Sequence, residues 1–241
     1  MKYILITGAT SGIGLATARF LAQKGCHLAI CGGHSKENLD LAVKELSSYP
    51  VTVLPYLGDC KDPQFVQRMF DDIYSHFPHL DAVINNAAVS YVGLLTDMSL
   101  EDWDNVIGTN LNSLFYTSRL VIPSMVRRKQ GRIISISSMW GESGASCETA
   151  YSASKGGVNS FTKALAKELA PSGIQVNALA FGTIDTRMND CFSPEEKQAL
   201  AEEIPAGRFG TCEEAAQMIW QLLEAPDYLT GQVIRMDGAY L

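Results

Sequence analysis

Short apolar runs rich in β-branched residues alternate with longer amphipathic segments along this chain. The runs predict strands at 2–7, 28–31, 51–57, 80–85, 132–137, 174–180 and 233–236. The segments between them predict a first helix that ends near residue 24 and further helices over 36–47, 63–77, 99–129, 151–170 and 213–223. Helices that alternate with short strands indicate an α/β fold with a parallel sheet covered on both faces.

Two stretches depart from this alternation. Pro123 lies inside the long fourth helical segment and is expected to kink or interrupt the helix. Around a short polar helix near 193–203 the pattern loosens, which predicts a substrate flap over 183–205. Ligands of such sheets bind beyond the carboxyl ends of the strands, where this flap would also lie.

Composition and charge narrow the class of protein. With 241 residues, of which 46% are hydrophobic and 19% charged, the chain can bury one large core, so we expect a single domain over 1–241. A net charge of −7 argues against nucleic-acid and membrane partners, because both need a basic surface. Neither a signal peptide nor a membrane-spanning run is apparent, so we expect a cytoplasmic protein. The six cysteines form no metal-binding cluster and no disulfide framework.

A glycine loop stands between the first predicted strand and the first helix. Its glycines are Gly8, Gly12 and Gly14, in the spacing G-x-x-x-G-x-G, which departs from the commoner G-x-G-x-x-G. Glycines let the backbone pass close to a pyrophosphate, and the free amides at a helix start favour an anion. Tight turns alone explain many such loops, but the position after a first strand favours a dinucleotide site.

Three proton-handling side chains are brought together by the predicted elements. Tyr151 and Lys155 are four residues apart in a helix-forming segment, so they share one helix face. Ser138 lies thirteen residues before Tyr151, just past the end of a predicted strand, where a loop could turn its hydroxyl toward that face. Taken singly, such a tyrosine is more often a packing residue, and such a serine is more often a turn or a cap.

These motifs, together with Asn85-Asn86-Ala87 and Gly108-Thr109-Asn110-Leu111, occur in a characteristic order. From end to end the chain resembles the short-chain dehydrogenase/reductase family. The resemblance implies a single Rossmann-type domain with a doubly wound, parallel, seven-stranded sheet and a nicotinamide cofactor. The catalytic residues that it implies are Asn110, Ser138, Tyr151 and Lys155.

Each implied catalytic role has a chemical reason. Tyr151 would supply the proton that a ketone needs as it accepts a hydride. The ammonium of Lys155 would lower the pKa of that phenol from about 10 and would hold the nicotinamide ribose. Ser138 would donate a hydrogen bond to the carbonyl oxygen, where negative charge develops. Asn110 would hold a water that relays protons to Lys155, although an asparagine there could also merely cap a helix.

The resemblance also implies a set of cofactor contacts. They are Gly8, Ser11, Gly12, Ile13, Gly14, His34, Ser35, Asp59, Asn85, Ala87, Tyr151, Lys155, Ile184 and Thr186. Asp59 would form a hydrogen bond with the adenine amine. Alternatively, Asp59 belongs to an ordinary turn at the end of a strand. Two positions depart from the family pattern, with Ala88 in place of a usual glycine and Phe181 in place of a usual proline.

The choice of nicotinamide cofactor depends on the end of the second predicted strand. NAD-specific sites place a carboxylate about 20 residues past the glycine loop, where this chain has Gly32 and Gly33. His34, Ser35 and Lys36 follow and could receive a 2′-phosphate, whereas Ser11 lacks the positive charge that many NADP-using relatives carry in the loop. The pattern therefore favours NADP(H) and leaves NAD(H) open.

Within the family, the chain is most similar to bacterial 3-oxoacyl-acyl-carrier-protein reductases. It looks closer still to a branch that reduces a 5-aminopentanone group on a lysine of elongation factor P. Glu148 could form an ion pair with such a cationic substrate, with help from Glu142, and Trp140 could wall the pocket. Alternatively, Glu148 serves a subunit contact or a helix start, and Trp140 belongs to the core.

Three functions are consistent with these residues. The first is a reductase of a carrier- or protein-tethered ketone, and the second is a dehydrogenase of a free alcohol, sugar or steroid. The third is a regulator that senses NADP without chemistry, which the intact catalytic set disfavours. Relatives commonly form tetramers through the helices near 110–129 and 151–170 and through the last helix and strand, so we expect a homotetramer.

Overall fold

Successive residues of each central strand point to opposite faces of one parallel sheet. The computed structural model describes residues 1–190 and 192–241. Its strands are β1 (Tyr3–Thr7), β2 (His27–Gly32), β3 (Val53–Leu57), β4 (Ala82–Asn85), β5 (Gly131–Ser138), β6 (Ile174–Phe181) and β7 (Val233–Met236). They form a seven-stranded sheet in the order β3-β2-β1-β4-β5-β6-β7, and every neighbouring pair is parallel. The predicted Rossmann-type α/β fold is confirmed.

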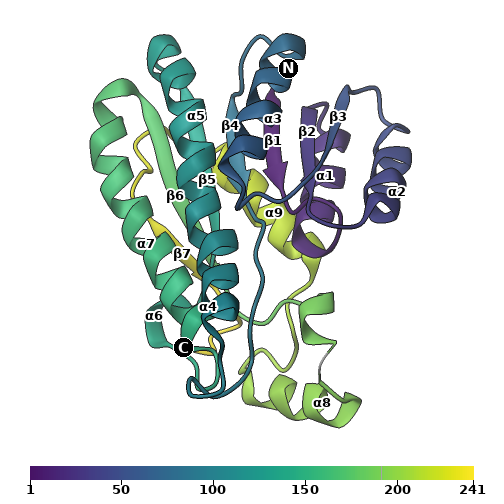
Figure 1. Cartoon of the computed structure of the whole chain (residues 1–241), viewed down its shortest axis with the longest axis vertical. Coiled ribbons are helices and arrows are strands. Elements are labelled where there is room, and N and C mark those ends of the chain that lie inside the picture. Colours follow the sequence, from purple (N-terminus) through teal and green to yellow (C-terminus); the bar gives the residue numbers. More distant parts are fainter. Residues whose placement is uncertain (191) are drawn as a thin grey trace.

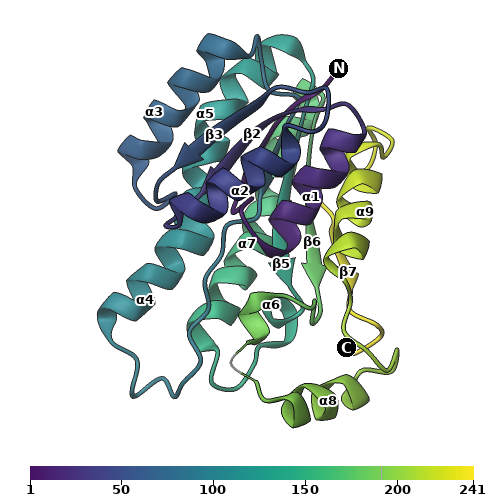
Figure 2. The same ribbon diagram turned by 90° about the vertical axis from the view of Figure 1, so that its right-hand side faces the viewer.

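Helices cover both faces of this sheet (Figures 1 and 2). One face carries α1 (Gly12–Gln23), α2 (Lys36–Leu46) and α9 (Cys212–Leu223). The other face carries α3 (Pro63–His76), α5 (Ser113–Arg128) and α7 (Thr149–Leu169). Ile4 and Ile6 of β1 pack into the first layer, whereas Leu5 between them packs into the second. The strands therefore read as continuous apolar runs because both of their faces are buried.

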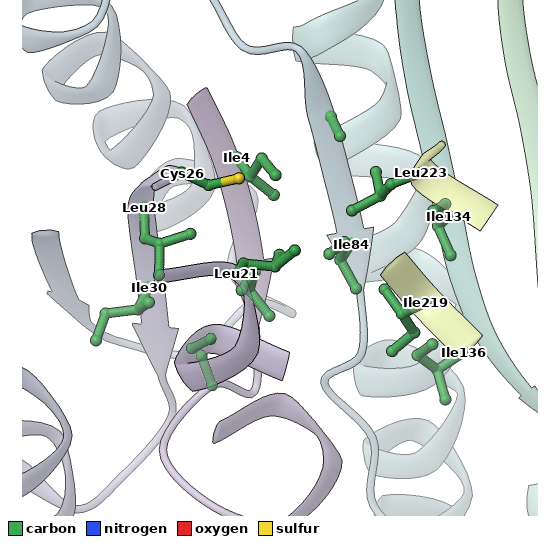
Figure 3. Close-up of a cluster of buried hydrophobic side chains, with 14 of the residues drawn as sticks. Ile4, Leu21, Cys26, Leu28, Ile30, Ile84, Ile134, Ile136, Ile219 and Leu223 are labelled. Atoms are coloured by element: carbon green, nitrogen blue, oxygen red, sulfur yellow. The ribbon is translucent and has the colours of Figure 1, made fainter. Parts of the chain in front are cut away.

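The apolar cluster beneath α1 and α9 holds the two halves of the sheet together. Figure 3 shows Leu21 of α1 and Ile219 and Leu223 of α9 against isoleucines of the strands. Ile84 of β4 and Ile134 of β5 occupy neighbouring register positions in this layer. All of these side chains are almost fully buried, so the layer is a closely packed core between the sheet and the two helices.

The long helical segment predicted over 99–129 is divided into three elements. They are α4 (Leu100–Ile107), the π-helix η1 (Gly108–Asn112) and α5. Pro123 lies inside α5, which continues through it to Arg128, so the helix is not interrupted there, and the alternative expectation of a kink stays a prediction. The break instead occurs at η1, where the backbone changes to the wider π-helical turn.

The remaining short elements gather at the carboxyl end of the sheet. They are α6 (Trp140–Ser143), η3 (Arg187–Asn189) and α8 (Pro194–Glu203). A further short element, η2 (Ala170–Ser172), lies at the opposite end of the sheet, between α7 and β6. The predicted flap holds η3 and α8, and α8 begins at a capping box between Ser193 and Glu196. In Figure 1, α8 lies below the sheet, beyond the carboxyl ends of the strands. Position 191 of the predicted flap lies outside the described residues.

Two predicted absences concern membranes and metals. Across residues 1–190 and 192–241, the helices are too short or too polar to cross a bilayer. Within the same ranges, His, Cys, Asp and Glu side chains nowhere gather in a group of three that could hold a metal ion.

Candidate active site

A cavity of about 310 Å³ opens where β1, β4, β5 and β6 end. The glycine loop, the segment after β4 and the first residues of the flap line its sides. Ser138, Tyr151 and Lys155 line it from β5 and α7. Residues from five segments that are far apart in the sequence thus meet at one place, as ligand sites of parallel sheets do.

The glycine loop is pressed against the segment after β4. A Cβ atom at Gly14 would lie 2.1 Å from the carbonyl oxygen of Gly8, and one at Gly8 would lie 2.8 Å from the Cα atom of Ala87. Asn86 fastens the contact, because its Nδ2 donates to the carbonyl oxygens of Thr7 and Gly8, both at 3.0 Å. These glycines are therefore required by close backbone packing as well as by any ligand.

Ser138, Tyr151 and Lys155 form a contiguous buried group. Ser138 is the last residue of β5 and pairs with Phe181 of β6, so it does not lie in a loop past the strand as the sequence predicted. Its hydroxyl forms a hydrogen bond with the hydroxyl of Tyr151. The Nζ of Lys155 lies 5.5 Å from the centroid of the Tyr151 ring and donates to the carbonyl oxygen of Ile136 at 2.8 Å.

Burial governs the ionisation of this group. Burial raises the pKa of Tyr151 to about 12, while the hydrogen bond from Ser138 lowers it and the charge of Glu148 raises it. Burial likewise lowers the pKa of Lys155 to about 8. The expected lowering of the tyrosine pKa by Lys155 is thus not seen here, because loss of hydration outweighs other effects on the phenol. At neutral pH, Tyr151 therefore holds its proton and is able to donate it.

Asn110 lies behind this group rather than in the cavity. Its side chain is buried within η1, where Oδ1 accepts from the backbone N–H of Val89 at 2.8 Å. Its Nδ2 donates to the carbonyl oxygen of Val89 at 2.9 Å and to the hydroxyl of Ser154 at 3.0 Å. The side chain therefore ties the segment after β4 to α7. Its implied role in holding a relay water stays a prediction.

The substrate side of the cavity has one acidic and one aromatic wall. Glu148 lines it just before α7, and the hydroxyl of Ser90 donates to its Oε2 at 2.9 Å. Burial raises the pKa of Glu148, although this hydrogen bond acts in the opposite direction. Trp140 also lines the cavity and packs edge-on against Tyr240, with ring centroids 6.0 Å apart.

Glu142 does not take part in this wall. It is exposed on α6 and forms an ion pair with Arg235, at 3.3 Å between Oε2 and Nη1. Its carboxylate has a cationic partner on β7 and Glu142 does not line the cavity, so its assistance to Glu148 stays a prediction.

Comparison with known proteins agrees with this geometry. The family model described as short chain dehydrogenase matches residues 2–197, which is most of the chain. The protein belongs to the short-chain dehydrogenase/reductase family. It is therefore an NAD(P)-dependent short-chain oxidoreductase.

Several relatives align over almost the whole of this short-chain oxidoreductase. The 3-oxoacyl-[acyl-carrier-protein] reductase FabG of Thermotoga maritima is 42% identical, over 98% of this chain and 96% of its own length. The uncharacterized oxidoreductase YmfI of Bacillus subtilis is 38% identical, over 99% and 98% respectively. The FabG of Aquifex aeolicus is 37% identical, over 98% and 96% respectively.

The residues present fit the nicotinamide cofactor that the family implies. Ser11 precedes α1 in an extended conformation, and no acidic side chain lies in the first turn, so its free amides can take a pyrophosphate. Gly12 has a φ of +51°, and a Cβ atom there would lie 3.4 Å from the Cγ2 of Thr186 in the flap. Ile13, Ala87 and Ile184 also line the cavity.

Four predicted cofactor contacts are not in the cavity. Ser35 caps α2 by accepting from the N–H of Asn38 at 3.1 Å, and His34 is exposed beside it. Asp59 accepts from the N–H of Lys61 at 2.9 Å in a turn, which is the alternative that the sequence allowed. The Oδ1 of Asn85 accepts from Thr117 at 2.7 Å, so this side chain joins the sheet to α5. Ser35, Asp59 and Asn85 each have a local hydrogen-bond partner, and the cofactor roles of all four residues stay predictions.

Sequence reasoning missed several polar residues that line the cavity, among them Asn86, Ser90 and Arg187. Asn86 stands in a motif that was recognised, yet its double hydrogen bond to the glycine loop has no local signature. Ser90 and Arg187 gave no signal, since neither belongs to a motif. Only the fold brings Ser90 next to Glu148, 58 residues further along the chain.

Proposed function

We propose that this protein reduces a ketone with NADPH, and that the ketone is carried on a protein. The observation that supports this most strongly is the buried group of Ser138, Tyr151 and Lys155 in the same cavity as the glycine loop. The relatives named 3-oxoacyl-[acyl-carrier-protein] reductases support a tethered ketone.

The chemistry follows from the protonation states in the cavity. When bound, the nicotinamide supplies the hydride that reduces the carbonyl carbon. The hydroxyl of Ser138 donates a hydrogen bond to the carbonyl oxygen, and Tyr151 delivers its proton to that oxygen as charge develops. Because burial raises the pKa of Tyr151, the phenol is a weak acid before the reaction and needs its phenolate stabilised. The ammonium of Lys155 would then stabilise the phenolate left behind.

A preference for NADPH is supported by the end of β2. A Cβ atom at Gly32 would lie 2.4 Å from the Cγ2 of Thr10, so the position has no room for the carboxylate of an NAD-specific site. His34 is exposed nearby, whereas Lys36 is engaged by Asp40. Fluorescence titration with NADPH and NADH tests the preference. Tighter binding of NADH would contradict it.

Glu148 supports a cationic ketone as the substrate. Its carboxylate lines the cavity and has the hydroxyl of Ser90 as its partner, and within the described residues it forms no ion pair. A half-buried carboxylate of this kind gains most from a substrate that brings a positive charge. The 5-aminopentanone group on a lysine of elongation factor P is such a ketone, and we propose it as the physiological substrate.

Two ketones compared in one assay test this proposal. NADPH oxidation is followed with an amino-ketone that mimics the modified lysine and with an acetoacetyl thioester. We expect faster turnover of the amino-ketone, and a selective loss of at least about tenfold in Glu148→Gln, since a buried ion pair is removed. Faster turnover of the thioester, unchanged in Glu148→Gln, would contradict the cationic substrate and favour fatty-acid elongation. Turnover of free sugars or steroids alone would favour the second enzyme class.

We also propose a homotetramer. Phe115 is 48% exposed on α5, which together with α7 is one of the helices through which relatives were expected to pair. Leu100, on the preceding helix α4, is 86% exposed. Burying such side chains against a second copy would stabilise the assembly. Light scattering should give four times the chain mass of 26.2 kDa. A monomer would contradict this proposal.

A further inference from the structure

Three successive residues of β5 contact the same part of α7. The carbonyl oxygen of Ile136 accepts from the Nζ of Lys155 at 2.8 Å. The hydroxyl of Ser137 donates to the Oδ1 of Asn159 at 2.6 Å, and it also lies 3.3 Å from the backbone oxygen of Lys155 as a second acceptor. The hydroxyl of Ser138 forms the hydrogen bond with Tyr151. Both ends of Lys155 are therefore held by neighbouring residues of one strand.

The contact of Ser137 is enclosed by protein. Ser137, Lys155 and Asn159 are 3%, 2% and 6% exposed, so water hardly competes for these hydrogen bonds. Gly141 closes the contact, because a Cβ atom there would lie 2.7 Å from the carbonyl carbon of Lys155 and 3.0 Å from the Nδ2 of Asn159. A helix packed this closely cannot slide along the strand without breaking the Ser137 hydrogen bond.

We propose that Ser137 and Asn159 are positioning residues that fix the place of α7 along β5 and so the point at which Lys155 and Tyr151 act. Lysine has a long stem with many rotamers, so the position of its ammonium depends on where its backbone is held. The pair holds that backbone next to Ile136, whose carbonyl oxygen receives the ammonium. The proposal rests on the proposed reductase function, in which Tyr151 donates its proton to the ketone and Lys155 stabilises the phenolate left behind.

The strand offers a matched control. Ser135 lies two residues before Ser137, on the same face of β5, and is 1% exposed. Its hydroxyl has no hydrogen-bond partner among the described residues. Ser135→Ala thus makes the same chemical change in the same layer without removing a hydrogen bond to α7. Ser137→Ala and Asn159→Leu each remove the proposed contact, and the double variant tests whether the two residues act as one unit.

The first readout is steady-state turnover with NADPH and the better of the two ketones. We expect kcat to fall about fivefold in Ser137→Ala, with KM for the ketone within about twofold of the parent, because a hydrogen bond that orients the proton donor is lost. The double variant should be no slower than the slower single variant. Ser135→Ala should match the parent.

The second readout needs no substrate. The pKa of Lys155 is measured by NMR of protein labelled with 13C at the lysine ε-carbon, with Lys155→Met to assign the signal. We expect this pKa to fall by about half a unit in Ser137→Ala, since the ammonium loses part of its hydrogen bond to Ile136. If the pKa of Lys155 and kcat both match the parent, the proposal is wrong, even where melting temperature falls. If the parent reduces no ketone, the proposed function fails, while the pKa of Lys155 still decides this inference.

Discussion

Replacing Lys155 with methionine is expected to stabilise the fold while it removes activity. The side chain is 2% exposed, and its ammonium donates to the carbonyl oxygen of Ile136. Burial lowers the pKa of Lys155 from 10.5 to about 8, which means that the folded protein binds this proton less tightly than the unfolded chain does. The charged form of Lys155 therefore lowers the free energy of unfolding of the protein.

The size and pH dependence of the effect follow from this pKa. The difference between 10.5 and about 8 corresponds to about 3 kcal/mol of destabilisation at pH 7. Loss of the hydrogen bond to Ile136 offsets about 1 kcal/mol, so Lys155→Met should gain about 2 kcal/mol. Between pH 8 and 10.5 the unfolded chain binds more protons than the folded protein, so the penalty in the parent shrinks as pH rises. The advantage of the variant is therefore full below pH 8 and lost toward pH 10.5.

Urea denaturation at pH 6.5, 7.5 and 9.5 measures this difference directly. We expect the free energy of unfolding of Lys155→Met to exceed that of the parent at the two lower pH values and to approach it at the highest. A variant that is less stable than the parent at pH 6.5, or a difference that does not change with pH, would refute the reasoning.

Three further predictions concern the glycine loop, backbone strain and pH. Gly14→Ala should weaken NADPH binding at least about tenfold and lower the melting temperature, because its Cβ atom would lie 2.1 Å from the carbonyl oxygen of Gly8. The control is Gly33→Ala, where nothing lies within 4 Å of the added Cβ atom, and its Kd in a fluorescence titration should match that of the parent. Equal Kd values for both variants would count against the glycine loop as the cofactor site. Cys147→Gly should raise the free energy of unfolding by about 0.5–1 kcal/mol in urea, because Cys147 has a φ of +62°, and a loss of stability would contradict this. Ketone reduction should slow above about pH 8 as Lys155 loses its proton, and a kcat that stays flat to pH 9.5 would be inconsistent with its role.

Most of the fold could be predicted because its periodic pattern is strong. Strands buried on both faces and helices with one apolar side differ clearly in sequence, so each predicted element is present with shifts of only a few residues at its ends. The π-helix η1 could not be predicted, since it depends on Asn110 reaching Val89 and Ser154 in other segments. Pro123 does not interrupt α5, because the local steric rule that allows either a kink or an interruption does not by itself decide between them.

The candidate site was predictable only where it is local. The spacing of Tyr151 and Lys155 on one helix face can be read from the sequence alone. The partners of Glu148 and Glu142 could not be predicted from the sequence, because Ser90 lies 58 residues from Glu148 and Arg235 lies 93 residues from Glu142. The ionisation of Tyr151 also depends on burial, which no motif encodes.

The central claim is that Tyr151 delivers the proton when a ketone is reduced with NADPH. Stopped-flow absorbance of NADPH oxidation, with the parent and Tyr151→Phe, tests it most directly. We expect the variant to lose about 100- to 10,000-fold in the rate of turnover while its Kd for NADPH stays within about twofold of the parent. Unchanged turnover in Tyr151→Phe would contradict the assigned mechanism.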